Sequence, residues 1–124
     1  MKTFLLPATA GGPGAILRYS LSSWIHHQTG NAFPWGIITV NVLGCLIFGL
    51  LWILAEERFL LSRSVSIIAL TGFVGSFTTF STMAFETITL FKTSSLCSAL
   101  IYLGTGPFPG IMAAIARTGI ANTI

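Results

Sequence analysis

Residues 72–86 read GFVGSFTTFSTMAFE, a polar stretch inside a chain that is otherwise strongly apolar. The stretch carries five hydroxyl side chains, two glycines and a carboxylate at a place where a membrane span is expected. In hydrocarbon, an unpaired backbone group costs several kcal/mol, so irregular polar backbone persists there only when protein buries it or when it lines a wet path. We therefore interpret this stretch as the functional centre of a membrane protein.

The composition of the whole chain favours one small integral membrane domain. Of its 124 residues, 53% are hydrophobic and 7% are charged, whereas soluble domains carry about 25% charged residues. A membrane helix needs roughly 20 apolar residues, so four spans with short connections would use nearly all of residues 1–124. The six Lys and Arg residues are scattered rather than clustered, which argues against a nucleic-acid partner.

Hydrophobic runs and breakers predict an all-α integral membrane protein with four transmembrane helices per subunit. The predicted spans are 3–25, 33–55, 65–91 and 96–116, and the third is broken near 75–79. Prolines and glycines interrupt the first span, which we interpret as a retained span rather than a signal peptide. Lys and Arg near the span ends are only weakly biased toward one side, so insertion in both orientations is physically allowed.

The two histidines and the two cysteines of the chain are not interpreted as metal ligands or redox groups. His26 and His27 are expected in the polar turn between the first two spans. Cys45 and Cys97 fall in different predicted spans, without metal-ligand or redox spacing. We interpret both cysteines as small buried apolar residues.

Polar residues of the third span share one side of a helix. Thr79, Thr82, Met83 and Glu86 are separated by three or four positions, and Phe80 lies three positions before Met83. Such a stripe must face protein or water rather than lipid. The hydroxyls alone are equally consistent with a helix–helix contact, whereas a carboxylate within the membrane favours a functional role.

Polar residues in the other spans extend this pattern. Asn41 lies deep in the second span, where its amide either joins two helices or donates to an anion. Arg18 in the first span either extends to the membrane interface or attracts anions into a vestibule. Tyr102 is the candidate that the fourth span contributes to a polar path.

Three motifs follow one another along the chain. The first is GGPGAILRY at 11–19, the second is PWG at 34–36 followed by VNVLG at 40–44, and the third is TGF at 71–73 followed by TTFST at 78–82. The first resembles the pattern G-G-x-x-G-x-x-x-R-[YW] and the second resembles P-x-G-T-x-x-x-N-x-x-G. Both patterns belong to the CrcB/Fluc family of fluoride channels, whose third-span signature the last motif resembles.

This resemblance implies a fluoride-selective ion channel, not an enzyme, that exports fluoride passively through the cell (inner) membrane as a multi-pass protein. It implies an antiparallel dual-topology homodimer in the lipid bilayer, with two fluoride pores along the subunit interface. It also implies a structural sodium ion, not transported, held by backbone carbonyls of Gly75 and Thr78 from both copies. The side chains that it places on the fluoride path are Asn41, Thr79, Phe80, Ser81, Thr82, Met83, Glu86 and Tyr102, with Arg18 in the vestibule.

The chain departs from the family pattern at three places. Met83 stands where the family has a second phenylalanine, Ser76 follows the glycine of the break, and Gly106 and Gly110 stand where serine is common. Two other functions stay open at this point: a non-conducting partner subunit of a heterodimeric channel, and a small proton-coupled multidrug or cation antiporter. Such an antiporter is expected to carry its essential Glu in the first span, whereas the intramembrane Glu here is Glu86.

Overall fold

The computed structural model describes residues 2–109, 111–112 and 115–116, and all regular structure in these ranges is helical. The predicted all-α fold is therefore confirmed for these residues. Two elements, η1 and η2, are π-helices that continue an α-helix without a loop. The elements in chain order are α1 (Lys2–Thr29), α2 (Trp35–Trp52), η1 (Ile53–Glu57), α3 (Arg63–Ser66), η2 (Ile67–Val74), α4 (Gly75–Phe77), α5 (Phe80–Thr93) and α6 (Leu96–Thr105).

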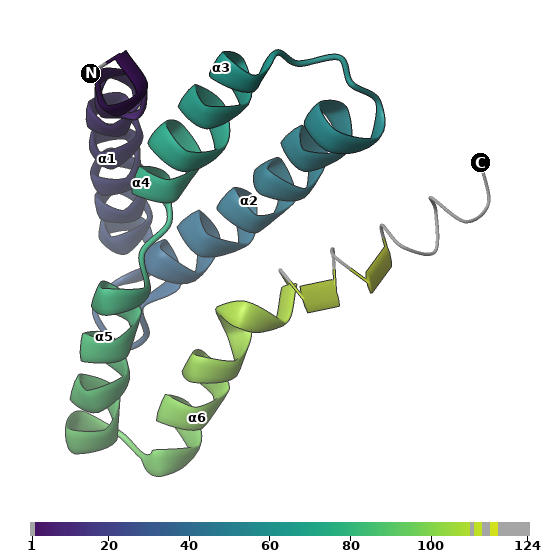
Figure 1. Ribbon diagram of the computed structural model, residues 1–124. Helices are drawn as coiled ribbons and strands as arrows, with labels where there is room; N and C mark the ends of the chain where they lie inside the picture. Colours follow the sequence, from purple (N-terminus) through teal and green to yellow (C-terminus); the bar gives the residue numbers. More distant parts are fainter. Residues whose placement is uncertain (1, 110, 113–114, 117–124) are drawn as a thin grey trace.

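The helices form two groups on either side of a break in the chain (Figure 1). α1 packs along η2, α4 and α2, whereas α5 pairs with α6 in a hairpin beyond the break. Two helical stretches, Trp35–Glu57 and Arg63–Thr93, have the length and apolar composition needed to cross a membrane. The predicted number of crossings and the predicted dimer stay predictions.

The predicted break in the third helical stretch is confirmed. Thr78 and Thr79 leave the helical conformation, with ψ angles of 156° and 121°. α4 ends immediately before these two residues, and α5 begins immediately after them. The chain therefore changes direction at the polar stretch from which the sequence argument began (Figure 1).

α1 is longer and more regular than the sequence predicts. It runs through Pro7 and Pro13 without a break, so the prediction that these residues interrupt the helix is wrong; packing against other helices lets a helix retain internal prolines. The helix ends where Gly30 adopts a φ of +80° and donates its N–H to the carbonyl of His26 over 2.9 Å. His26 and His27 consequently lie in the last turn of α1, and their prediction as loop residues is wrong.

Small residues bring the helices of the first group close together. A Cβ atom at Gly72 of η2 would lie 2.7 Å from the carbonyl oxygen of Pro7 on α1. A Cβ atom at Gly36 of α2 would lie 3.0 Å from Cα of Ser22, also on α1. Because backbone atoms cannot move aside as a side chain can, glycine at both positions permits the close packing that fixes α1 against η2 and α2.

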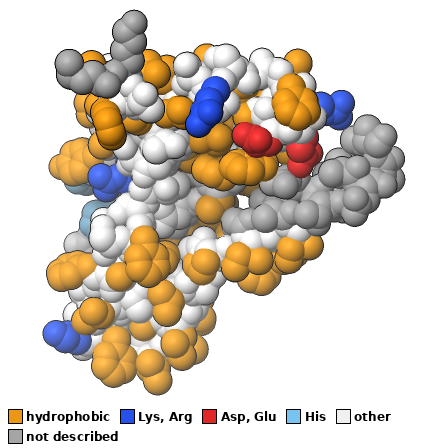
Figure 2. All heavy atoms as spheres, viewed as in Figure 1, with side chains coloured by type: hydrophobic (Ala, Val, Ile, Leu, Met, Phe, Trp, Pro, Cys, Tyr) orange, Lys and Arg blue, Asp and Glu red, His pale blue; other side chains and the backbone are white. Residues whose placement is uncertain are grey.

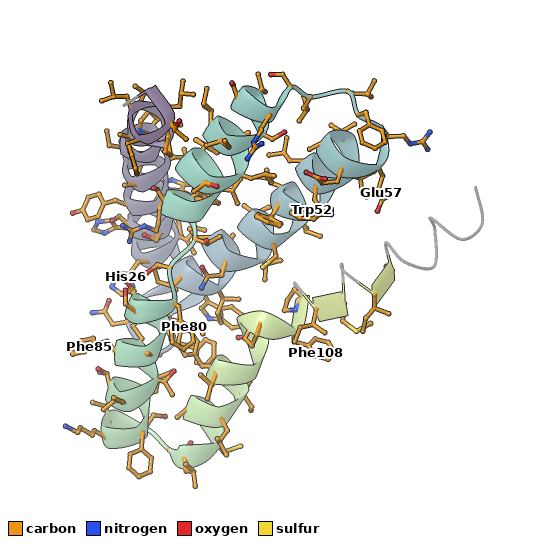
Figure 3. All side chains as sticks on the ribbon, in the orientation of Figure 1. His26, Trp52, Glu57, Phe80, Phe85 and Phe108 are labelled. Carbon is orange, nitrogen blue, oxygen red and sulfur yellow. The ribbon has the colours of Figure 1, made fainter. Side chains whose placement is uncertain are left out.

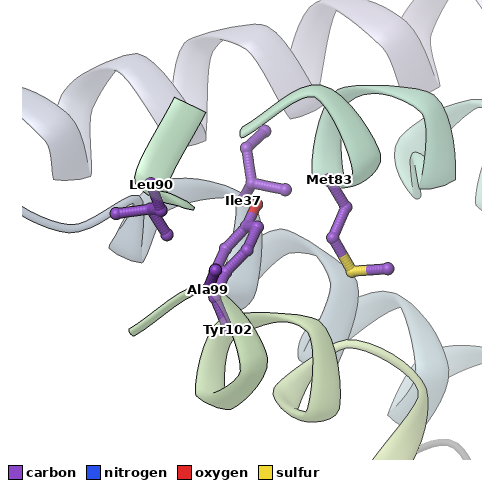
Figure 4. Packing of buried hydrophobic residues seen from close by; sticks show 5 residues of the cluster. All are labelled: Ile37, Met83, Leu90, Ala99 and Tyr102. Carbon is purple, nitrogen blue, oxygen red and sulfur yellow. The ribbon is translucent and has the colours of Figure 1, made fainter. Parts of the chain in front are cut away.

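A compact apolar cluster connects α2 with the α5–α6 hairpin (Figure 4). Tyr102 is fully buried at its centre, and its ring makes a T-shaped contact with Phe33 at a centroid distance of 5.8 Å. The cluster consists of Ile37, Met83, Leu90, Ala99 and Tyr102. It therefore fixes the polar side of α5 relative to α2.

Large apolar side chains also cover the outside of the chain (Figure 2). Phe4, Ile16 and Phe85 are 81%, 68% and 71% exposed. Soluble monomers rarely expose apolar surface on this scale, so lipid or another protein chain must cover it.

The fourth predicted span, 96–116, is only partly represented by α6. Helix α6 ends at Thr105, and helical turns resume at 107–109. Pro107 begins this second segment, where a residue without a backbone N–H is tolerated because that N–H would have no helical partner. Gly110, one of the departures from the family pattern, lies outside the described residues.

Candidate functional site

The break is created by a side chain that takes a donor away from the backbone. In a continuous α-helix the N–H of Thr79 would donate to the carbonyl of Gly75, four residues earlier. In this chain the N–H of Thr79 donates instead to Oδ1 of Asn41 on α2, over 3.0 Å. The carbonyl of Gly75 therefore loses its helical donor at the point where the chain becomes extended.

A second carbonyl loses its donor on the other side of the break. Thr79 is the N-cap of α5, and its Oγ1 accepts the N–H of Thr82 over 3.4 Å. That N–H would otherwise donate to the carbonyl of Thr78. The Thr79 hydroxyl also donates to Oγ1 of Thr82 over 3.1 Å and lies 3.4 Å from Oγ of Ser81. Both carbonyls predicted as sodium ligands, those of Gly75 and Thr78, are thus carbonyls whose helical donors are redirected to side chains.

Asn41 holds the break from both sides of Thr79. Its Oδ1 accepts the N–H of Thr79, and its Nδ2 donates to the carbonyl oxygen of Thr79 over 3.2 Å. Nδ2 also lies 3.9 Å from Sδ of Met83. The residue is 7% exposed, and its polar atoms are paired within the protein, as burial requires. Of the two roles that the sequence left open, the structure shows the joining of two helices, while donation to an anion stays a prediction.

Arg18 supplies a hydrogen-bond donor to a third carbonyl at the break, that of Ser76. Its Nε donates to the carbonyl oxygen of Ser76 over 3.3 Å, and in a continuous helix that carbonyl would accept the N–H of Phe80. A guanidinium group has five N–H donors in all, so others stay available to face a neighbouring cavity. Arg18 therefore lies against the break itself, and its predicted vestibule role stays a prediction.

A first cavity, which we call the Asn41 cavity, lies beside the break and has a volume of about 200 Å³. Phe80 is 72% exposed and Met83 is 4% exposed, so Phe80 forms its open rim and Met83 its inner wall. Figure 3 shows Phe80 and Phe85 on opposite sides of α5, so Phe85 does not supply a second ring to this cavity. The residues that line it are Asn41, Cys45, Thr78, Thr79, Phe80, Met83, Gly106 and Pro107.

A second cavity, which we call the Glu86 cavity, lies between α1, α2 and α5 and has a volume of about 330 Å³. Oε2 of Glu86 accepts a hydrogen bond from the hydroxyl of the buried Tyr102. The carboxylate and the phenol are therefore oriented by each other. The residues that line the cavity are Arg18, Tyr19, Ser22, Ser23, His26, His27, Pro34, Gly36, Ile37, Thr82 and Glu86.

The predicted path residues fall into two groups rather than one. The group at the Asn41 cavity is Asn41, Thr79, Phe80 and Met83, and the group at the Glu86 cavity is Arg18, Thr82 and Glu86. Ser81 is exposed and lines neither of these cavities, and Tyr102 reaches the second one only through Glu86. Thr82 and Met83 are neighbours in sequence, and a rotation of about 100° per helical residue directs them to different cavities.

Several residues at these cavities were not identified from the sequence. Cys45 lines the Asn41 cavity, and its position one helical turn after Asn41 was an available signal. It is half-buried, whereas Cys97 is exposed, so the interpretation of Cys97 as a buried apolar residue is wrong. Two departures from the family pattern also meet here, because a Cβ atom at Gly106 would lie 3.0 Å from Cε of Met83.

The described residues contain no group of three or more His, Cys, Asp or Glu side chains that could hold a metal ion. A cation at the break would instead be bound by backbone carbonyl oxygens, which suit hard cations. The carbonyls of Gly75 and Thr78 fit this requirement, because no hydrogen bond among the described residues replaces their lost helical donors.

Comparison with known proteins places these features in a family. The family described as CrcB-like protein, Camphor Resistance (CrcB), matches residues 5–119, which include the break and both cavities. A protein of Nitrosococcus oceani named fluoride-specific ion channel FluC is 48% identical to this chain over 96 residues, 77% of each protein. Proteins with the same name from Solidesulfovibrio magneticus and Nitratidesulfovibrio vulgaris are 40% and 36% identical over 117 and 124 residues, which are 94% and 100% of both chains compared.

Proposed function

The chain belongs to the CrcB-like family, and we propose that it is a fluoride-selective ion channel that exports fluoride passively from the cell. The observation that carries this proposal is the similarity, over essentially the whole chain, to proteins named fluoride-specific ion channels. These relatives are ion channels and not enzymes. The chain is a membrane protein, and we place it in the inner cell membrane with several crossings.

The chemistry at the Asn41 cavity suits fluoride. Fluoride is small and holds its water tightly, so a path must replace that water by protein donors in stages. The amide of Asn41, the hydroxyl of Thr79 and the positive ring edge of Phe80 are groups of this kind. Exit must also stay easy, so no single group should bind the ion strongly.

The Glu86 cavity suits the entrance to such a path. The cationic side chain of Arg18 attracts anions, and the hydroxyl of Thr82 can replace part of their hydration. The carboxylate of Glu86 would repel an anion, and its hydrogen bond with Tyr102 supports a role in orienting a donor rather than contacting fluoride. The predicted path residues thus divide into an outer and an inner part.

We extend the proposal to an antiparallel homodimer with one structural sodium ion at the break. Gly75 is exposed in the single chain, and the carbonyls of Gly75 and Thr78 lack helical donors. Two copies that meet at this point would bring four such carbonyls together, without a carboxylate. Sodium would supply positive charge to these oxygens and hold the two copies together, and it would not be transported.

Fluoride efflux from vesicles tests the proposed function directly. Purified protein is reconstituted into fluoride-loaded lipid vesicles, and an ion-selective electrode records the released anion. We expect fluoride to leave far faster than chloride from matched chloride-loaded vesicles, without a proton gradient. Equal leak of the two anions, or no flux of either, would refute the channel, and the second result would favour the non-conducting partner subunit.

The sodium ion is tested by exchanging it for a bulky organic cation. A ligand that binds only the assembled dimer stabilises it by mass action, so this exchange should lower dimer stability and fluoride flux together. Gly75→Val should weaken the site sterically, whereas Thr78→Ser retains the carbonyl and serves as the matched control. Dimer stability and flux that do not respond to the exchange would contradict the sodium assignment.

An antiporter has less support than a channel. The sequence of α1 (Lys2–Thr29) contains no Asp or Glu, whereas the antiporter hypothesis expects its essential Glu in the first span. The same vesicles distinguish the two functions, because an antiporter requires a proton gradient and a channel does not.

A further inference from the structure

The side of α1 that faces the Glu86 cavity carries a row of three polar residues. Arg18, Ser22 and His26 are separated by four positions each, so they lie one above another on the same side of the helix. α5 presents Thr82 and Glu86 with the same spacing from the opposite wall. His26 thus lies at one end of a row that begins at the arginine bound to the break.

His26 lies close to the charged groups of this cavity. It lines the same cavity as the carboxylate of Glu86 on α5, and Figure 3 shows it near the start of that helix. The other titratable or charged groups that line the cavity are Arg18, Tyr19 and His27, all on α1, and α2 contributes none. α6 contributes the hydroxyl of Tyr102, which is bound to Glu86.

The charge of the cavity depends on these imidazoles. When Glu86 is ionised and both histidines are neutral, the charges of Arg18 and Glu86 cancel. Each protonated imidazole then adds one positive charge to the cavity. Imidazole is the side chain that ordinarily changes its charge between about pH 5 and 8.

We propose that His26 is a second anion-attracting group of this entrance, which recruits fluoride when its imidazole is protonated. The inference rests on the proposed channel function and adds a pH-dependent control of entry. Protonation changes the cavity from balanced to positive, so the local concentration of anions rises and entry becomes faster. His26 acts through its charge at the entrance and is not part of the narrow path, because it does not line the Asn41 cavity.

Fluoride efflux at two pH values tests this proposal. Vesicles that contain the purified chain are measured with the same buffer on both sides, at about pH 8 and about pH 5.5, the range in which imidazole changes its charge. Protein-free vesicles at each pH give the flux of hydrogen fluoride through the lipid, which is subtracted. For each charge added to a solvated cavity we expect the protein-mediated flux to rise by up to about threefold at the lower pH.

Three substitutions separate charge from structure. His26→Gln should remove most of the rise, because glutamine is polar but does not protonate. His26→Lys should give high flux at both pH values, a result that a merely structural role would not produce. His27→Gln, on the neighbouring row, should retain at least half of the rise. His26 is exposed, so none of these changes disturbs the core, and size-exclusion chromatography verifies assembly.

The outcomes distinguish this inference from the proposed function. A His26→Gln protein with the same acid-side rise as the unsubstituted chain overturns the inference and leaves the channel intact. Low flux of the His26→Lys protein at both pH values also overturns it. Absence of fluoride flux from the unsubstituted chain at both pH values overturns the channel function, and the inference with it.

Discussion

Replacing Asn41 by leucine tests whether this residue creates the break. Leucine has a similar size but can neither accept the N–H of Thr79 nor donate to its carbonyl, the two hydrogen bonds of 3.0 and 3.2 Å. A buried N–H left without a partner costs about 1–3 kcal/mol, and loss of the second bond adds about 1 kcal/mol, because an N-cap carbonyl keeps its helical donor. We therefore expect the protein to lose about 2–4 kcal/mol of stability.

The chain can recover part of this cost by repairing the helix. The N–H of Thr79 can return to the carbonyl of Gly75, which repairs the helix and removes the break. Fluoride flux should then fall heavily even in protein that still assembles. Unfolding of the purified protein in detergent measures the stability, hydrogen exchange at the Thr79 amide reports its hydrogen bond, and vesicle efflux measures function.

Thr39→Val is the matched control on the same helix. The Thr39 hydroxyl donates only to the carbonyl of Trp35 in its own helix, over 2.9 Å, so its removal should change stability by no more than about 0.5 kcal/mol. If Asn41→Leu behaves like this control in stability, amide exchange and flux, the break does not depend on Asn41 and the reasoning is wrong.

Four further substitutions probe packing and the path. Gly72→Ala should destabilise the protein by about 1–3 kcal/mol, because the added Cβ clashes with the backbone of α1. At Gly104 the added Cβ enters open space, so Gly104→Ala should stabilise the protein by about 0.5–1 kcal/mol. Equal unfolding midpoints of the two variants would contradict this reasoning. Tyr102→Phe keeps the buried ring but loses the hydrogen bond to the carboxylate of Glu86, so it should lower the stability by about 1.5–3 kcal/mol and reduce the flux. An unchanged unfolding midpoint would show that this hydrogen bond does not stabilise the fold. Phe80→Leu alters an exposed side chain, so it should change the stability by no more than about 0.5 kcal/mol but reduce the fluoride flux strongly. Wild-type flux would show that Phe80 does not line the fluoride path.

The elements that the sequence predicted correctly are those with a local cause. The all-helical fold follows from apolar composition and periodicity, and nearby hydroxyl and glycine residues favour a break near 75–79. The contact with Asn41 that creates the break is not local and was not predicted. The N-cap role of Thr79 was not predicted, although its cause is also local, because its hydroxyl binds a backbone N–H only three residues away.

The elements that sequence reasoning could not settle depend on contacts between distant residues. Whether Asn41 joins helices or faces an anion is decided by Thr79, which lies 38 residues later. The division of the path residues between two cavities depends on where α1 lies, and the continuity of α1 through its prolines depends on packing against η2. His26 was placed in a loop because the turn signal at 30–31 was extended backwards, although Gly30 alone ends the helix.

The hydrogen bonds around the break bear on the proposed dimer. Four carbonyls, those of Gly75, Ser76, Phe77 and Thr78, lose their helical donors there, and Arg18 donates to the one on Ser76. Among the described residues nothing replaces the donors of Gly75 and Thr78, although Asn41 and Thr79 hold the backbone open at these two positions. In hydrocarbon each such carbonyl costs several kcal/mol, which supports the proposal that these carbonyls meet a partner from outside the chain. A cation shared with a second copy meets this requirement, since one bound ion would satisfy the freed carbonyls of both copies at once.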